Sequence, residues 1–254
     1  MIRRRVRGFL ARRLSSEEYL GLHLTIGLLV CLILVGVFGV LAHSVVGERA
    51  LTAFDERVGL ALEAHREHSP RLRHALIVFT EIGSWEAMAG LTVLVALGLL
   101  MRRRRLLALV WLLAMIATAV LNLGLKSAFG RDRPAFHDSF IHETTHSFPS
   151  GHSMGAVIAY GMLTYFLWLV LAARHEKVAV VVLAALLALT IGFSRIYLGA
   201  HYFSDVVGGF IVGGAWLSVC ISGAESARRR LRHHHHHHPK APEPPVGPPS
   251  RGGP

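Results

Sequence analysis

Long apolar runs alternate with short basic clusters along most of this 254-residue chain. Apolar runs of this length are typical of helices that cross a lipid bilayer. The second run has a blurred start, because polar residues between positions 81 and 86 either line a cavity or lie at the membrane interface. The pattern predicts an all-α bundle of six membrane-spanning helices, at about residues 24–42, 80–101, 106–125, 152–172, 178–193 and 202–221.

The segment between the first two runs, residues 44–73, is polar and mixed in charge. Its apolar residues recur at helical spacing, which predicts a short helix lying on the outer surface. These positions are Leu51, Phe54, Val58, Ala61 and Leu62. The acids and arginines between them are expected to form a solvated face of that helix.

The chain ends in a segment whose composition cannot form a packed core. Residues 231–254 are rich in His, Pro and Gly, and are expected to be a disordered tail after a membrane domain that spans residues 1–230. The run His233–His238 is either native or a purification tag, and the sequence leaves both readings open.

Basic clusters between the runs predict the orientation in the membrane. The chain is 52% hydrophobic and 17% charged, which excludes an ordinary soluble domain. The clusters Arg102–Arg105, Arg174–Lys177 and Arg228–Arg232 all fall on the side of the basic N-terminus. Both termini are therefore expected to be cytoplasmic, with residues 127–150 and 194–201 on the outer side. The net charge of +11 flanks apolar runs, which favours membrane orientation over binding of nucleic acid.

The stretch Ser194–Asp205 combines the residue types needed for nucleophilic catalysis. His201 and Asp205 are four residues apart, so they would share a face if the last apolar run is helical. A carboxylate that holds one ring nitrogen leaves the other as a nucleophile or base, and Arg195 could hold an oxyanion nearby. Taken alone, a surface arginine, a capping aspartate and an interfacial histidine explain this stretch equally well.

Two further motifs precede this stretch. Lys126 is followed after six residues by Arg133-Pro134, and Pro149-Ser150-Gly151-His152 opens the fourth run. Together with Ser194-Arg195, His201 and Asp205, this three-part pattern resembles the signature of the type 2 phosphatidic acid phosphatase (PAP2) superfamily. All three parts are complete, in order, and at predicted outer ends of spans.

The resemblance implies a phosphatase that uses neither a metal nor another cofactor. His201 would attack phosphorus and form a phosphohistidine, Asp205 would orient its ring, and His152 would protonate the departing alkoxide and later activate water. Phosphate-binding groups would surround the transferred group, which spreads negative charge over its oxygens. They are Lys126, Arg133, Ser150, Gly151 and Arg195.

The resemblance also implies a substrate and a location. Related bacterial proteins of this size act on phosphatidic acid, phosphatidylglycerol phosphate or undecaprenyl pyrophosphate. The expected protein is thus a multi-pass enzyme of the bacterial inner membrane, with its site on the extracytoplasmic surface. The sequence says nothing about which lipid is used or about oligomeric state.

Three alternatives remain. A phosphohistidine could pass its phosphate to a glycolipid acceptor instead of water, which would make the protein a phosphotransferase. A non-catalytic protein could use the basic pocket to bind anionic lipids, although binding does not require the histidine pair. The segment His142–His146 also fits H-E-x-x-H, the zinc-protease pattern. That pattern requires a helix, which two adjacent threonines and the nearby Pro149 disfavour; His137, His142 and His146 are otherwise loop residues or shape the pocket mouth.

Overall fold

The computed structural model describes residues 22–47, 49–135 and 144–236, and within them it contains helices and no strand. This confirms the predicted all-α class. The helices are α2 (Leu22–Gly47), α3 (Arg49–His68), α4 (Pro70–Glu81), α5 (Trp85–Met101), α6 (Arg105–Phe129), α7 (Gly151–Trp168), α8 (Arg174–Tyr197) and α9 (Phe203–His236).

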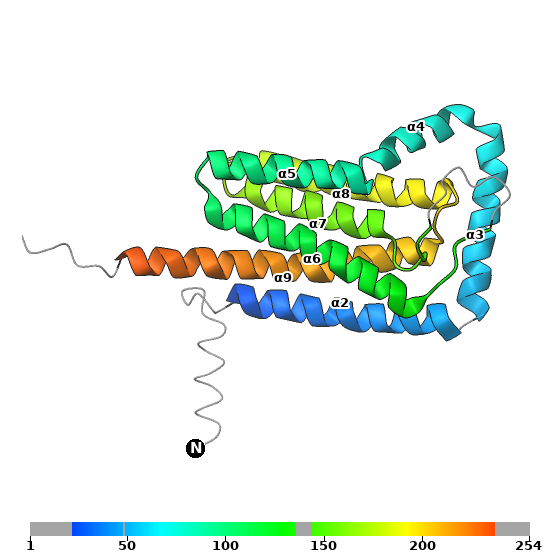
Figure 1. Ribbon diagram of the computed structural model, residues 1–254, viewed down its shortest axis with the longest axis horizontal. Coiled ribbons are helices and arrows are strands. Elements are labelled where there is room, and N and C mark those ends of the chain that lie inside the picture. The colour runs from blue at the N-terminus through cyan, green and yellow to red at the C-terminus, as the bar shows by residue number, and fades with distance from the viewer. Residues whose placement is uncertain (1–21, 48, 136–143, 237–254) are drawn as a thin grey trace, which may run out of the picture.

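The bundle is formed by helices that run along a common direction in Figure 1, namely α2, α5, α6, α7, α8 and α9. Helix α3 lies across one end of the bundle, and α4 leads from it back to α5. Helix α7 is central, since it packs against α8 and α9 and also contacts α6 and α5. This central helix carries one of the sequence motifs at its first turn.

Within the described ranges, four helices are long and apolar enough to cross a membrane, namely Leu24–Gly47, Arg105–Phe129, Arg174–Tyr197 and Phe203–Arg230. The pair α4 and α5 makes a fifth if it is counted as one span that is bent by 44°. Helix α7 has 18 residues, eight of them buried, and completes the bundle. The protein is therefore a multi-span membrane protein, and the six predicted segments are consistent with its helices.

Several helices extend past the apolar runs that predicted them. Helix α6 continues to Phe129, so Lys126 lies in its last turn, and α8 continues to Tyr197 and includes Arg195. Helix α9 continues to His236, through the first residues of the expected tail, whose residues 237–254 lie outside the described part. Polar residues thus end the apolar runs without ending the helices.

Glycines let α9 lie directly against the start of α7. A Cβ atom at Gly209 would lie 2.6 Å from the backbone oxygen of Ser150, and one at Gly213 would lie 3.1 Å from that of Met154. No larger residue fits such contacts without moving a backbone. Small residues permit close helix approach in membrane proteins, and here they bring the first turns of two helices together.

Helix α3 forms where the sequence predicts a short outer helix. The expectation that all its acids and arginines face solvent is wrong for Asp55 and Arg66, which are 1% and 2% exposed. Arg66 donates to the backbone oxygen of Tyr197 at the end of α8. Asp55 accepts hydrogen bonds from two other segments, described below. Burial of an ionised group is sustained only by such partners.

Candidate active site

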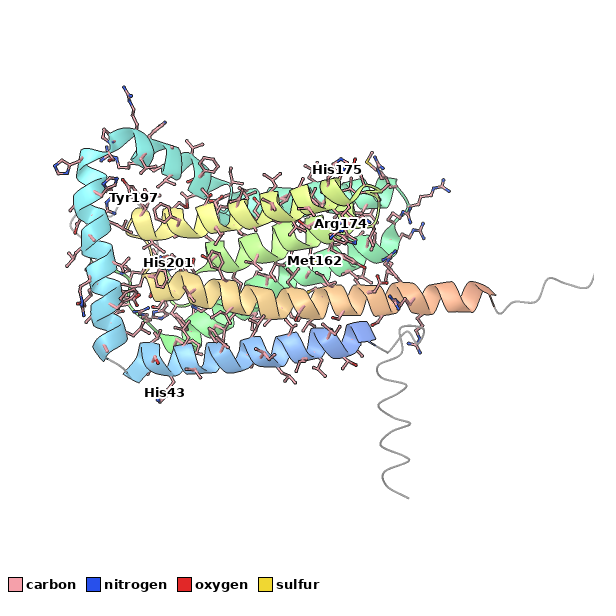
Figure 2. All side chains as sticks on the ribbon, turned by 180° about the vertical axis from the view of Figure 1, so that it is seen from behind. His43, Met162, Arg174, His175, Tyr197 and His201 are labelled. Carbon is pink, nitrogen blue, oxygen red and sulfur yellow. The ribbon has the colours of Figure 1, made fainter. Side chains whose placement is uncertain are left out.

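The three sequence motifs meet at the end of the bundle that α3 crosses. In Figure 2, His201 lies beside the start of α9 at this end, whereas Arg174 and His175 lie at the opposite end. The basic clusters that connect α5 to α6 and α7 to α8 are therefore remote from the candidate site.

Asp205 holds the ring of His201, but the geometry differs from a shared helix face. Helix α9 begins at Phe203, so His201 lies in the turn before it. The backbone N–H of His201 donates to the backbone oxygen of Arg195. The Oδ2 atom of Asp205 lies 3.3 Å from His201 Nδ1 and also accepts the backbone N–H of Tyr202 at 2.9 Å. Asp205 is the third residue of α9, and its side chain accepts from the backbone N–H of the cap residue Tyr202, as an acid at this position often does. This bond fixes the carboxylate beside the imidazole.

The partners of His201 define which of its nitrogens carries the proton. The second ring nitrogen, Nε2, lies 3.3 Å from the guanidinium of Arg133. An arginine can only donate hydrogen bonds, so Nε2 accepts and Nδ1 carries the proton that is donated to Asp205. Nε2 therefore presents its lone pair toward a cation, in the tautomer that a nucleophile needs.

Arg133 and Lys126 share a threonine beside His201. Lys126 Nζ donates to Thr145 Oγ1 at 2.8 Å, and Arg133 donates to the same oxygen at 3.2 Å and to the backbone oxygen of Thr145 at 2.7 Å. Arg133 also donates to the backbone oxygen of Ala200 at 2.8 Å. These bonds hold the first motif against the residue that precedes His201.

The first turn of α7 is fixed from both sides. Ser150 is fully buried, its backbone N–H donates to the backbone oxygen of Asp205 at 2.9 Å, and its hydroxyl caps α7 by accepting from Ser153 N–H. On the other side, the Asn122 side chain lies against Gly151, where a Cβ would come within 2.9 Å of its oxygen. Asn122 also donates to the oxygen of Pro149 at 3.3 Å. A helix N-terminus placed in this way is a natural anion site.

His152 and Arg195 both lie near the bend between α4 and α5. A Cβ atom at Gly83 would lie 3.2 Å from the ring of His152, so this ring packs directly on the bend. Arg195 is 1% exposed and donates to Thr80 Oγ1 at 3.0 Å. Gly83, one of the residues that interrupt the second apolar run, therefore lies at the candidate site, and so does Thr80, which directly precedes the interruption.

The sequence reasoning missed Arg131 and Asp55, which support the site from behind. Arg131 donates to Asp205 Oδ1 at 2.6 Å and to Asp55 Oδ2 at 2.8 Å. Ser204 donates its backbone N–H to Asp55 Oδ1 at 3.0 Å, and its hydroxyl donates to Oδ2. Burial lowers the pKa of Arg131, but the two carboxylates outweigh it and leave the pKa raised above its usual value.

One signal in the sequence could have found Asp55. It is four residues after Leu51 and three before Val58, so it shares the apolar face of the predicted outer helix. An acid on the buried face of an amphipathic helix requires a partner. No comparable local signal marks Arg131, which lies between two residues of the first motif.

The structure describes only part of the segment that fits the zinc-protease pattern. His142 and Glu143 lie outside the described residues, and His146 is exposed, with its backbone oxygen accepting a bond from Arg133 at 3.3 Å. Within the described ranges, no group of three His, Cys, Asp or Glu side chains could hold a metal ion.

Comparison with known proteins identifies the family. The model of the PAP2 superfamily matches residues 107–229. Phosphatidylglycerophosphatase B of Bacillus subtilis (strain 168) is 33% identical over 178 residues, which cover 69% of this chain and 86% of the relative. Lipid A 1-phosphatase of Rhizobium etli is 37% identical over 125 residues, covering 43% of this chain and 48% of that protein.

A solved structure agrees with these sequence matches. The crystal structure of a transmembrane PAP2 type phosphatidylglycerolphosphate phosphatase from Bacillus subtilis superposes with a TM-score of 0.68 at 32% identity. The match covers 76% of this chain and 94% of the other. It includes more of the chain than the family model does. The chain therefore belongs to the PAP2 superfamily, and it is a phosphatase of that family.

Proposed function

We propose that this protein hydrolyses the phosphate or diphosphate group of a membrane lipid through a phosphohistidine on His201. The observation that carries the proposal is the alignment of Asp205, His201 and Arg133, with bonds of 3.3 Å on either side of the imidazole. This arrangement leaves the Nε2 lone pair directed at the cation that would bind the phosphoryl oxygens. A binding protein has no need for this tautomer.

In the first step, the Nε2 lone pair of His201 attacks phosphorus and forms a P–N bond. The bond from phosphorus to the lipid oxygen breaks, and this oxygen takes a proton from His152. The imidazole of His201 becomes positively charged, and buried Asp205 stabilises that charge. Lys126, Arg133 and Arg195 bind the three phosphoryl oxygens as negative charge spreads over them.

In the second step, water attacks the phosphohistidine and His152 accepts the proton from that water. The P–N bond breaks, its electron pair returns to Nε2, and inorganic phosphate leaves. His152 regains the protonation state in which it began, so the cycle closes. An imidazole suits both halves of this cycle because its usual pKa is close to neutral.

The position of the site suits a lipid substrate. The site lies at one end of a bundle of membrane helices, where a head group can reach the cations while its chains remain in the bilayer. We place this end on the extracytoplasmic side of a bacterial inner membrane, because the basic clusters lie at the other end and favour the cytoplasm.

Phosphatidylglycerol phosphate is the first substrate to test. The Bacillus subtilis relative of known structure is described as a phosphatidylglycerolphosphate phosphatase, and its match covers most of both chains. Phosphatidic acid and undecaprenyl pyrophosphate present the same terminal phosphate to the same cations. All three belong in one panel.

The test is phosphate release by purified protein in nanodiscs with excess EDTA, over that panel, for wild type and His201→Ala. We expect EDTA-resistant release that falls by at least about 10⁴-fold in the variant, as for loss of a covalent nucleophile. His43→Ala, which changes an exposed histidine on α2, is the control and should match wild type.

Other outcomes would replace the proposal. Transfer of phosphate to a glycolipid without release would identify a phosphotransferase. Lipid binding without any phosphate transfer would identify a binding protein. Release that EDTA abolishes, and that is lost in His146→Ala but kept in His201→Ala, would support metal chemistry in the loop.

A further inference from the structure

An open groove runs along the bundle between α2 and α8, away from the candidate active site. Helix α2 packs on α9 and α8 packs on α7, so α7 and α9 form the floor of the groove and the other two helices form its sides. Its volume is about 870 Å³. It contains none of the residues to which the proposed reaction assigns a role.

The groove is apolar and has the length of a hydrocarbon chain. Along α7 it extends from Ala156 to Trp168, twelve residues apart, which is about 18 Å in a helix. One leaflet contributes about half of the roughly 30 Å hydrocarbon core. Small residues of α8 keep the wall open, since Ala184, Ala185 and Ala188 line it. The space therefore fits a straight chain that enters from one leaflet.

The groove ends near the active-site half of the bundle at a packed apolar cluster. Ala156 and Ala188 line its inner end and pack with Ile191, which is fully buried. Ile191 also lies against Gly83, which adjoins His152. This cluster separates the groove from the catalytic groups, so the two sites are distinct.

The opposite end of the groove is polar and basic. Arg228 donates to Glu225 at 2.7 Å and to the hydroxyl of Tyr165 at 3.3 Å, and all three line the groove. Arg229 donates to the other oxygen of Glu225 at 2.9 Å and Arg230 follows it on α9, so three arginines beside one acid leave a net charge of +2. Trp168 lies at the same end, as aromatic residues do where hydrocarbon meets head groups.

We propose that this groove binds one anionic phospholipid from the leaflet opposite the active site. Its acyl chain lies along α7 between α2 and α8, and its phosphate lies beside Arg228. The charge of the polar end and the length of the apolar part both match such a lipid. The proposal concerns binding at the far end of the bundle, and it holds whichever lipid is hydrolysed at His201.

Native mass spectrometry tests the apolar part of the groove. Protein released from nanodiscs of phosphatidylglycerol mixed with phosphatidylcholine should retain one phosphatidylglycerol. The variant A184L/A185L fills the groove and should lower this occupancy at least about tenfold, because no space remains for the chain. Ala179→Leu, on the same helix but outside the groove, should retain lipid as wild type does. Melting curves verify that each variant is folded.

The head-group end is tested with Arg228→Gln. Its preference for phosphatidylglycerol over phosphatidylcholine should fall about fivefold, the factor expected for one basic residue near an anionic lipid. Arg228→Lys should keep the preference, and Arg102→Gln, which changes an exposed arginine outside the groove, serves as control. Equal retention by wild type and A184L/A185L would overturn the proposal. Retention without head-group preference, or a dimer whose contact covers the groove, would overturn it as well.

Discussion

Arg131 and Asp205 form an ion pair of 2.6 Å directly behind the proposed nucleophile. The other oxygen of the same carboxylate faces His201, so the guanidinium determines where this oxygen lies. Through its second nitrogen, Arg131 also binds Asp55 of α3. The crossing helix at the end of the bundle is thus connected to the imidazole through two buried ion pairs.

Replacing Arg131 by Gln should lower both activity and stability. The change leaves two buried carboxylates without their cation, which costs about 3–5 kcal/mol of unfolding free energy. Phosphate release should fall more than tenfold, mainly in kcat, because Asp205 is no longer held. Arg131→Lys, which keeps the positive charge, should retain more phosphate release than Arg131→Gln does. The control Arg102→Gln alters an exposed arginine at the far end and should change neither property.

Asp55→Asn tests whether α3 acts through Arg131. We expect kcat to fall about threefold to tenfold with little change in KM, since Asp55 does not touch the proposed phosphate site. A double-mutant cycle with Arg131→Gln should give a coupling energy of about 1–3 kcal/mol. Glu56→Gln changes the adjacent exposed acid and is the matched control. Additive effects of Asp55→Asn and Arg131→Gln would contradict the connection.

Thr80→Val should weaken phosphate binding through Arg195. The valine has nearly the same shape but removes the oxygen that accepts from the guanidinium at 3.0 Å. A lost bond to a charged group corresponds to about a tenfold to hundredfold decrease in kcat/KM. Inhibition by inorganic phosphate should weaken in parallel. Thr118→Val, another buried threonine that donates within its own helix, should leave kinetics unchanged.

Gly209→Ala should separate the first turns of α7 and α9. Its new methyl group would lie 2.6 Å from the backbone oxygen of Ser150, so the helices must move apart. We expect a loss of stability of about 1–3 kcal/mol and a large fall in kcat. In Gly90→Ala, where nothing lies within 4 Å, the melting temperature should stay the same or rise. Wild-type kinetics in Gly209→Ala would show that close approach is dispensable.

Ionisation of the Arg131 guanidinium should not contribute to the pH dependence of stability between about pH 6 and 10. Its pKa is raised in the folded protein, so its contribution is complete below the unfolded pKa and is lost only as pH rises through the folded one. Both values lie above this range. Wild type should therefore lose no stability through Arg131 as pH rises from about 8 to 10, whereas Arg131→Lys should begin to lose stability near the usual pKa of lysine, as denaturant titrations can measure.

The apolar pattern predicted the helical class and the six bundle segments, because bilayer thickness sets the length of each run. It was less accurate for helix ends. Lys126 and Arg195 ended their runs, yet α6 and α8 continue past them. Lys126 finds a partner in Thr145 of the loop before α7, and Arg195 finds one in Thr80 of α4. A hydropathy pattern cannot register such partners, which come from distant segments.

The same limit applies to the site. His201 and Asp205 were predicted to pair because they are close in sequence, although the pairing arises from a helix cap rather than from a common face. Arg131 and Asp55 are 76 residues apart, and their contact depends on how α3 crosses the bundle. In the sequence, Asp55 is marked only by its place on the apolar face of the predicted outer helix, and Arg131 has no local mark that separates it from the many exposed charges of this basic chain.

The distribution of the site over the chain makes phosphatase activity a late event in biogenesis. Lys126, Arg133 and His152 belong to segments made early, whereas His201 and Asp205 come with the last helix. A nascent chain that has not yet inserted α9 contains the proposed phosphate-binding cations of the earlier segments but lacks the proposed nucleophile. Under the proposed mechanism, the enzyme is silent until its final helix has docked, and truncation before residue 201 should abolish phosphate release.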